Sequence, residues 1–331
     1  MEPPTPLSES KLPKIPPGLG VRHVQALMTF FCLVLAYAMR VNLSVAIVAM
    51  TDNSSNSHYT EMPWDSSMKG VILSSFFWGY LILQVPAGEM ARRFGAKYLL
   101  FGAMMVCSVF TILSPIIAQN FSWTVFFMTR VVQGLAQGFF YPSINAFLAK
   151  WAPPLERSRI FSFVFVGTQF GTVLTLPIAG YLAASPWGWP SIFYSTGLCG
   201  VLWAVVWLFV GANSPDSHPS ISDSEREYIL STRVGSSTRS RTMKTPLRQM
   251  LTSRAVWALT VAHFAHNWGK WTLITQLPSY LRHVYGYDIK SNGLISTLPF
   301  LCSLIMIIVF SWIADIINSR EFMSLSVSRK I

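Results

Sequence analysis

The chain has 331 residues, of which 52% are hydrophobic and only 12% are charged. This composition excludes a disordered chain and an ordinary water-soluble domain, and it predicts an all-α membrane protein that crosses the bilayer several times. The net charge of +11 is compatible with a nucleic-acid partner until the positions of the basic residues are compared with the apolar segments.

Eight stretches are apolar and long enough for the roughly 20 residues that a membrane-spanning helix needs. They are residues 24–50, 68–90, 98–118, 122–150, 160–184, 190–212, 256–281 and 293–317. Residues 1–23 are rich in Pro and Ser and lack the apolar core of a signal peptide, so they are predicted to form a cytoplasmic tail. The hydrophilic residues 213–253 form a cytoplasmic linker between a six-helix half, residues 24–212, and the first two helices of an incomplete second half, residues 254–331.

Most of the 25 Lys and Arg residues lie before the first span or in the loops after the second, fourth, sixth and eighth spans. All these segments are on one side of the membrane, and the positive-inside rule makes that side cytoplasmic, together with the N-terminus. The basic charge therefore follows the bilayer and gives no support to a nucleic-acid partner. On the opposite side, Asn53 begins an Asn-Ser-Ser triplet and is a candidate glycosylation site. The four cysteines all lie within spans, so we expect neither a disulfide framework nor a metal site.

Two arginines lie inside apolar spans. Arg40 precedes the outer end of the first span by ten residues, and Arg130 follows the outer start of the fourth span by eight, so both are predicted roughly 12 to 15 Å below the outer surface. Neither span contains an Asp or Glu that could neutralise them. Because a lone cation in hydrocarbon costs at least about 2.5 to 3.5 kcal/mol, a bound anion is the expected counter-charge. Pairing with helix carbonyls or water is the alternative.

The fourth span carries a polar stripe. Arg130, Gly134, Gln137 and Tyr141 recur at helical spacing and are predicted to line one face. Gly134 also forms a GxxxG pair with Gly138, which is typical of close contact between helices.

A second polar cluster lies on the seventh span. His263, Asn267 and Lys270 share one face of the predicted helix, and His266 is offset from it. All four are candidate substrate ligands. The histidines can instead be hydrogen-bond partners between helices, and Lys270 can either add positive charge for a dianion or extend outward to the membrane surface.

Several motifs resemble one transporter family. The segment PAGEMARRFGAK is similar to the loop motif of the major facilitator superfamily, and RVVQGLAQGFFYP with KWAPPLERSR resembles its anion/phosphate cotransporter family. That family includes sialin, the vesicular glutamate transporters and the type I sodium–phosphate cotransporters. The resemblance implies the fold of the superfamily with twelve transmembrane helices, of which this chain has eight. We therefore expect a C-terminally truncated chain, from an incomplete gene prediction or a shortened isoform, which does not transport alone.

The resemblance also assigns roles to residues. It implies that Arg40 and Arg130 bind the anionic group of the substrate. Gln137 stands where the sialin and glutamate branches carry a proton-coupling glutamate, whereas the type I phosphate branch shows a glutamine, which favours coupling to sodium or to membrane potential over protons. Leu73 and His266 replace a histidine and an arginine of the glutamate transporters, so glutamate is a poor substrate candidate.

The loop motif offers a separate site. Its residues in this chain are Gly88, Glu89, Arg92, Arg93 and Gly95, and Asp315 occupies the corresponding place in the second half. The resemblance implies a latch that controls gating, and a solvated loop is the alternative.

The sequence therefore predicts a secondary active transporter of inorganic phosphate or small organic anions in the plasma membrane or a lysosomal or vesicular membrane. A proton-coupled, sialin-like transporter and a non-transporting truncated isoform are the alternatives. No nucleotide-binding or catalytic motif indicates an enzyme, and no cofactor other than a coupling ion is expected.

Overall fold

The computed structural model describes residues 18–51, 61–237 and 247–319, and every element within these ranges is a helix. The transmembrane-sized and connecting helices of the first part are α1 (Val21–Met50), α2 (Ser66–Phe94), α3 (Ala96–Asn120), α4 (Trp123–Gln137), α5 (Phe140–Trp151), α6 (Arg157–Ala183) and α7 (Pro190–Val210). They are followed by η2 (Pro215–Ser217), α8 (Asp223–Ser237), α9 (Leu247–Thr252), α10 (Arg254–Tyr285) and α11 (Ile289–Ser319).

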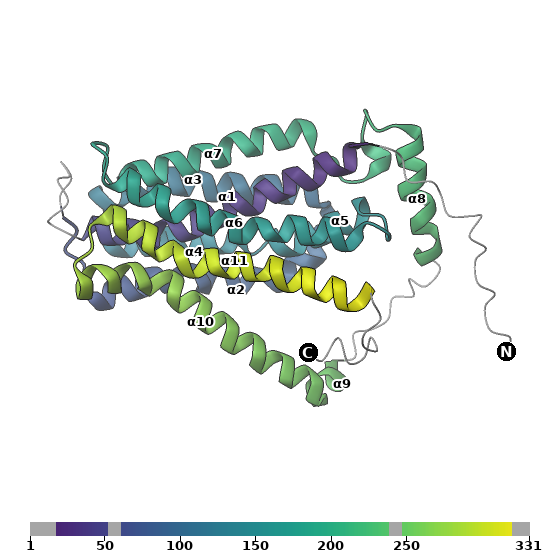
Figure 1. Ribbon diagram of the computed structural model, residues 1–331. Helices are drawn as coiled ribbons and strands as arrows, with labels where there is room; N and C mark the ends of the chain where they lie inside the picture. The colour runs from purple at the N-terminus through teal and green to yellow at the C-terminus, as the bar shows by residue number, and fades with distance from the viewer. Residues whose placement is uncertain (1–17, 52–60, 238–246, 320–331) are drawn as a thin grey trace.

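The long helices lie side by side in one bundle with α1 in its interior (Figure 1). α1 packs against α6 and α7, α2 against α4, α3 against α7, and α11 along α6. Most α1 residues are buried, as expected for a helix that is apolar around its whole circumference. The bundle core is therefore organised around the helix that carries Arg40.

Among the described residues, six helices are long and apolar enough to cross a membrane: α1, α2, α3, α6, α7 and α11. The predicted fourth span is present as two helices, α4 and α5, which are separated by a turn at Gly138 and Phe139. The predicted seventh span corresponds to α10, in which residues 254–268 are all exposed. The number of eight spans stays a prediction.

Glycines bring α2 and α4 into close contact. A Cβ atom on Gly134 would collide with the backbone oxygen of Phe76, and one on Gly79 would collide with that of Val131. The expectation that Gly134 serves close helix packing is thereby confirmed. This proximity of α2 and α4 places the aromatic side chains of α2 beside the arginine of α4.

The connection between α2 and α3 depends on Gly95. Its φ of 84° lies in a region that residues with a Cβ atom rarely adopt, and a Cβ there would also meet the side chain of Asn213. Asn213 in turn accepts a hydrogen bond from the Lys97 backbone N–H at 2.9 Å. This loop-motif glycine therefore has a structural role.

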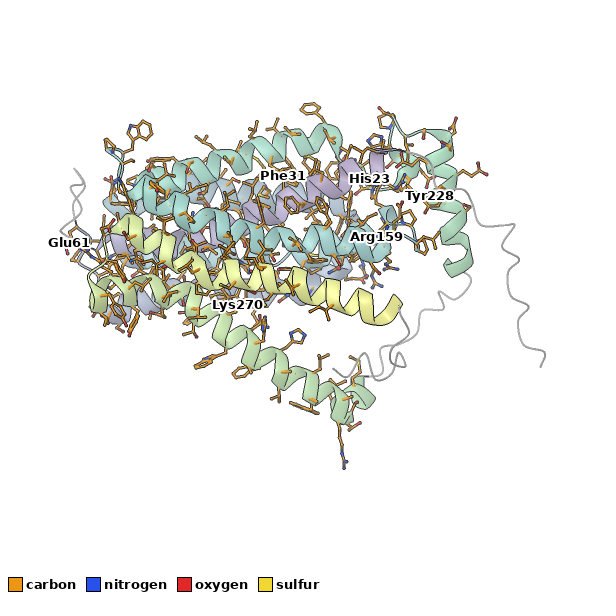
Figure 2. All side chains as sticks on the ribbon, viewed as in Figure 1. His23, Phe31, Glu61, Arg159, Tyr228 and Lys270 are labelled. Atoms are coloured by element: carbon orange, nitrogen blue, oxygen red, sulfur yellow. The ribbon has the colours of Figure 1, made fainter. Side chains whose placement is uncertain are left out.

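The linker contributes a helix to the bundle core. Tyr228 and Ile229 of α8 are buried in the same apolar cluster as Trp151 and Trp207. Figure 2 shows Tyr228 at the same end of the bundle as His23 and Arg159, and Glu61 at the opposite end. The predicted linker thus contributes buried residues to one end of the bundle.

α10 leaves the bundle over its N-terminal half and returns to it near its C-terminal end (Figure 1). Its buried residues, Ile274, Pro278 and Leu281, all belong to the returning part. Asp288 directly precedes α11, and its carboxylate accepts hydrogen bonds from the backbone N–H groups of Lys290 and Ser291, each at 3.2 Å. Hydrogen bonds from Ser291 hold the pKa of Asp288 below its ordinary value.

Candidate functional site

Arg40 of α1 and Arg130 of α4 lie next to each other inside the bundle. Their residues are only 7% and 3% exposed, and Arg130 Nη2 donates to the backbone oxygen of Arg40 at 3.4 Å. Both arginines line one small cavity with room for about one water molecule. Its other lining residues are Ser44, Leu73, Phe76, Phe77, Trp271, Ile274 and Thr275. The fold therefore brings the two predicted arginines to one point, which we call the arginine cavity.

Gln137 holds Arg40 in place. Its side-chain oxygen accepts a hydrogen bond from Arg40 Nε at 3.0 Å, and its side-chain nitrogen donates to the Ala36 backbone oxygen at 3.0 Å. Both ends of the amide are thus used between α4 and α1. Gln137 therefore contacts the arginine directly.

Arg130 has an equivalent partner in Gln133. Arg130 Nη1 donates to the Gln133 side-chain oxygen at 2.7 Å, and the Gln133 nitrogen donates to Thr111 Oγ1 at 3.2 Å. Thr111 Oγ1 donates onward to the Cys107 backbone oxygen at 2.6 Å. The Nε atom of Arg130 is buried without a hydrogen-bond partner among the described residues. Such an orphaned donor beside a cavity is suited to an incoming acceptor.

Aromatic rings surround the guanidinium of Arg40. Its central carbon lies 4.8 Å from the ring centroid of Tyr37, 4.7 Å from those of Phe76 and Tyr80, and 5.2 Å from that of Trp271. Each is within the range of a cation–π contact, which is worth about 0.5 to 2 kcal/mol. These rings stabilise a cation without neutralising it. The Tyr37 hydroxyl also pairs with that of Tyr141 at 2.7 Å, which connects the last member of the predicted stripe to the site.

Acidic groups in the described part of the chain do not balance the charge of the site. None of the ion pairs in the described part of the chain involves Arg40, Arg130 or Lys270. Lys270 Nζ lies 5.5 Å from the Tyr37 ring and 5.9 Å from the Trp271 ring, two rings that also flank Arg40. Lys270 thus points toward the aromatic groups of the site, so three cations gather there.

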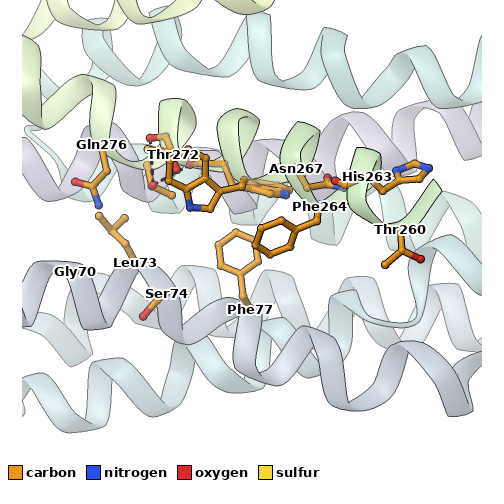
Figure 3. A pocket seen from close by; sticks show the side chains of 13 residues that line it. Gly70, Leu73, Ser74, Phe77, Thr260, His263, Phe264, Asn267, Thr272 and Gln276 are labelled. Carbon is orange, nitrogen blue, oxygen red and sulfur yellow. Dashed lines mark hydrogen bonds between the residues drawn. The ribbon is translucent and has the colours of Figure 1, made fainter. Parts of the chain in front are cut away.

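An open groove of about 920 Å³ lies between α2 and α10. His263 and Asn267 line it, whereas His266 is not among its lining residues. Figure 3 shows Phe77 from α2 and Phe264 from α10 pointing toward each other across this space.

The groove and the arginine cavity share four lining residues, Leu73, Phe77, Trp271 and Thr275. The rings of Phe77 and Trp271 meet edge to face with centroids 4.8 Å apart. This aromatic pair therefore separates the arginine cavity from the groove.

The loop-motif residues are at the surface. Glu89 forms ion pairs with Arg92 and, at 2.7 Å, with Arg93, and both arginine side chains are more than 70% exposed. These ion pairs join residues at one exposed end of a single helix. They agree with the alternative that the motif is a solvated loop and not a gating latch. Gly88 lies near Pro142 of α5, where a Cβ would have ordinary contact distance. The side chain of Asp315 and the predicted glycosylation residue Asn53 lie outside the part of the chain that the structure describes.

A third buried arginine was not predicted as a site. Arg22, at the start of α1, is 2% exposed and pairs with Glu156 at 2.8 Å and with Glu225 of α8 at 3.0 Å. Glu225 also accepts hydrogen bonds from the backbone N–H groups of Val21 and Arg22. Burial raises the pKa of the neighbouring Tyr228 hydroxyl, and the Glu156 carboxylate raises it further. We call Arg22, Glu156 and Glu225 the terminal cluster.

Sequence reasoning missed Gln133 and the aromatic residues of the site. Gln133 follows Arg130 by three positions, a spacing at which helical side chains are neighbours, and this was the available signal. Tyr37, Phe76, Tyr80 and Trp271 carry no equivalent signal, because aromatic residues in an apolar helix are equally compatible with lipid contact.

The profile of the Major Facilitator Superfamily matches residues 29–328. The chain is 37% identical over 326 residues to a Drosophila ananassae protein provisionally named an inorganic phosphate cotransporter, covering 92% of this chain and 67% of that protein. It is 34% identical to sialin of Ovis aries, covering 94% and 66% of the two chains. It is 37% identical to vesicular glutamate transporter 1 of Bos taurus, covering 95% and 58%. The chain thus spans 58 to 67% of the length of these relatives.

Solved structures agree in fold. A bacterial homologue of the human lysosomal transporter Spinster, in an inward-facing and unoccupied conformation, superposes with a TM-score of 0.69 at 14% identity, covering 92% of this chain and 64% of that one. A D-xylose–proton symporter superposes with a TM-score of 0.63 at 16% identity, covering 91% and 70%.

Proposed function

Because this chain belongs to the major facilitator superfamily, we propose that it acts in the transport of small anions across a membrane, with inorganic phosphate as the first candidate and small organic anions as the second. Arg40 and Arg130 are the primary anion ligands in this proposal. The observation that carries it is the pairing of two buried guanidinium groups at one cavity without an acidic partner among the described residues. An anion supplies the charge that the protein does not.

The closed state of the site suits a carrier rather than a pore. The cavity has room for about one water molecule, so an anion the size of phosphate requires a rearrangement before it can enter. The aromatic pair Phe77 and Trp271 lies between the cavity and the groove, and its movement would connect the two. Arginine is suited to this role because its planar fork of N–H donors fits phosphate and carboxylate oxygens in pairs.

Coupling to sodium or to membrane potential is the favoured mechanism. Gln137 cannot gain or lose a proton at physiological pH, and it contacts Arg40 directly. Proton coupling, as in a sialin-like transporter, is the second candidate, and it requires another group. His263 lines the groove between α2 and α10, and in this second candidate its imidazole carries the coupled proton.

The proposed setting is a plasma, lysosomal or vesicular membrane, with the N-terminus in the cytoplasm. The end of the bundle that carries His23, Arg159 and the docked α8 is the cytoplasmic end in this proposal (Figure 2). This orientation rests on the distribution of Lys and Arg between the loops.

The test combines binding and uptake on one preparation. Labelled phosphate is added to the purified chain in detergent and in proteoliposomes, with sodium, membrane potential and the pH gradient varied one at a time. We expect saturable phosphate binding that Arg40→Ala and Arg130→Ala abolish and that Arg→Lys restores only weakly. Uptake driven by sodium or by potential supports the preferred mechanism, and uptake driven by protons alone supports the sialin-like candidate. Binding without uptake is the result expected if the chain does not transport alone. Unchanged binding in both Ala variants would refute the site.

A further inference from the structure

Both arginines of the cavity are held by amides instead of carboxylates. Arg40 Nε donates to Gln137 at 3.0 Å, and Arg130 Nη1 donates to Gln133 at 2.7 Å. An amide oxygen accepts a hydrogen bond much as a carboxylate oxygen does, but it carries no net charge. The two glutamines therefore fix the direction of the guanidinium groups and leave their charge in place.

The glutamines are themselves anchored, so each presents its oxygen to the arginine. The Gln137 nitrogen donates to the Ala36 backbone oxygen, and the Gln133 nitrogen donates to Thr111. An amide rotated by half a turn would direct its N–H₂ group at a guanidinium and leave two donors facing each other. The Ala36 carbonyl oxygen can only accept, and the Thr111 hydroxyl already donates to the Cys107 backbone oxygen, so both anchoring groups act as acceptors and favour the oxygen facing the arginine.

The other ionisable groups around the site do not cancel this charge. Arg40 faces the hydroxyl-bearing rings of Tyr37 and Tyr80, and Tyr141 bonds to Tyr37. Cys107 contacts the backbone of Gln133. Phenols and thiols are neutral when protonated. Lys270 adds a third cation across the Tyr37 ring, and His263 lies farther out, on the groove.

We propose that Gln133 and Gln137 are specificity-determining residues, which select a doubly charged tetrahedral anion over a singly charged one of the same shape. They do so by positioning two guanidinium groups without compensating either charge. The inference rests on the proposed function, because it requires Arg40 and Arg130 to be the anion ligands. A carboxylate at either glutamine position would neutralise one cation and remove the preference for the second negative charge.

Sulfate and methyl sulfate test this inference, because they share a tetrahedral centre and differ by one fixed negative charge; the added methyl group is the same in every variant, so a change of their ratio between variants reports on charge. Each is used to displace labelled phosphate from the purified chain. We expect sulfate to compete at a concentration about tenfold lower than methyl sulfate, or lower still, which corresponds to about 1.4 kcal/mol or more. In Gln137→Glu and Gln133→Glu the ratio should fall to about one or invert.

Matched neutral variants separate charge from geometry. Gln137→Met and Gln133→Met remove the hydrogen-bond acceptor without adding charge, so we expect both anions to bind more weakly and their ratio to persist. Thermal unfolding of each variant shows whether it is folded.

Three results would overturn the inference: a ratio near one in the wild-type chain, an unchanged ratio in both Glu variants, or an equal loss of the ratio in the Met variants. Failure of the wild-type chain to bind phosphate and both sulfates would instead refute the proposed function, so the two failures are distinguishable.

Discussion

The terminal cluster and the arginine cavity treat the same kind of residue in opposite ways. Arg22 and Arg130 are buried to the same extent, at 2% and 3% exposure. Arg22 is paired with two carboxylates, whereas Arg130 has a glutamine side chain and a backbone oxygen. A buried arginine with acidic partners serves the fold, because its charge is already compensated. One held by neutral oxygens keeps its charge for a ligand.

Arg22→Met is the substitution with the largest expected effect. It leaves Glu225, which is 3% exposed, and Glu156, which is 19% exposed, without their cation, so we expect the free energy of unfolding to fall by about 3 kcal/mol, the lower end of the range for a broken buried pair. Thermal and denaturant unfolding in detergent measure this loss. Phosphate affinity of the folded fraction should not change. Arg226→Met is the matched control, because Arg226 and Asp216 are both nearly half exposed and such pairs contribute about 0 to 1 kcal/mol. If Arg22→Met and Arg226→Met lose the same free energy of unfolding, the acidic partners of Arg22 do not stabilise the fold more than an exposed ion pair does.

Arg130→Met, the same substitution at the other region, should have a different outcome. It removes a buried charge that has no acidic partner among the residues that the structure describes, so we expect a melting temperature in anion-free buffer at or above that of the wild type. Saturating phosphate should raise the melting temperature of the wild type but not of the variant, because a ligand at 100 times its Kd contributes about 2.7 kcal/mol. A large destabilisation without phosphate would show that Arg130 serves the fold as Arg22 does.

Lys270→Gln should have the smallest effect of the three substitutions. It tests whether Lys270 contacts the anion directly. Lys270 Nζ faces the aromatic rings and does not line the arginine cavity. We therefore expect phosphate binding to weaken only by about three- to tenfold, in line with the strength of a screened long-range charge. The difference from wild type should shrink as ionic strength rises from 0.01 to 1 M, since the Debye length falls from about 30 to 3 Å. A complete loss of binding would make Lys270 a direct ligand.

The sequence was sufficient for the parts of the structure that depend on one helix at a time. Apolar length predicted the helices, and ten and eight residues of helical rise predicted that Arg40 and Arg130 share one depth. Their contact at 3.4 Å agrees with that calculation. The same local reasoning placed Gln137 and Tyr141 on the face of Arg130, and both do reach residues of α1.

Features that depend on packing between distant segments were not predictable. Nothing near Arg22 in the sequence indicates Glu225, which lies 203 positions away, and the linker composition gave no sign that Tyr228 would be buried. The turn between α4 and α5 interrupts an apolar run in which periodicity predicts one continuous helix.

The distance along the chain between Arg22 and its partners has a consequence for synthesis. Glu156 follows Arg22 by 134 residues and Glu225 by 203. At a translation rate of about 5 to 20 residues per second, roughly 10 to 40 s pass between the appearance of Arg22 and that of Glu225. Until Glu156 is made, neither carboxylate of the terminal cluster is present to pair with Arg22, and the cluster is complete only when α8 is made. Insertion of the first helix and closure of this end of the bundle are therefore separate events in time.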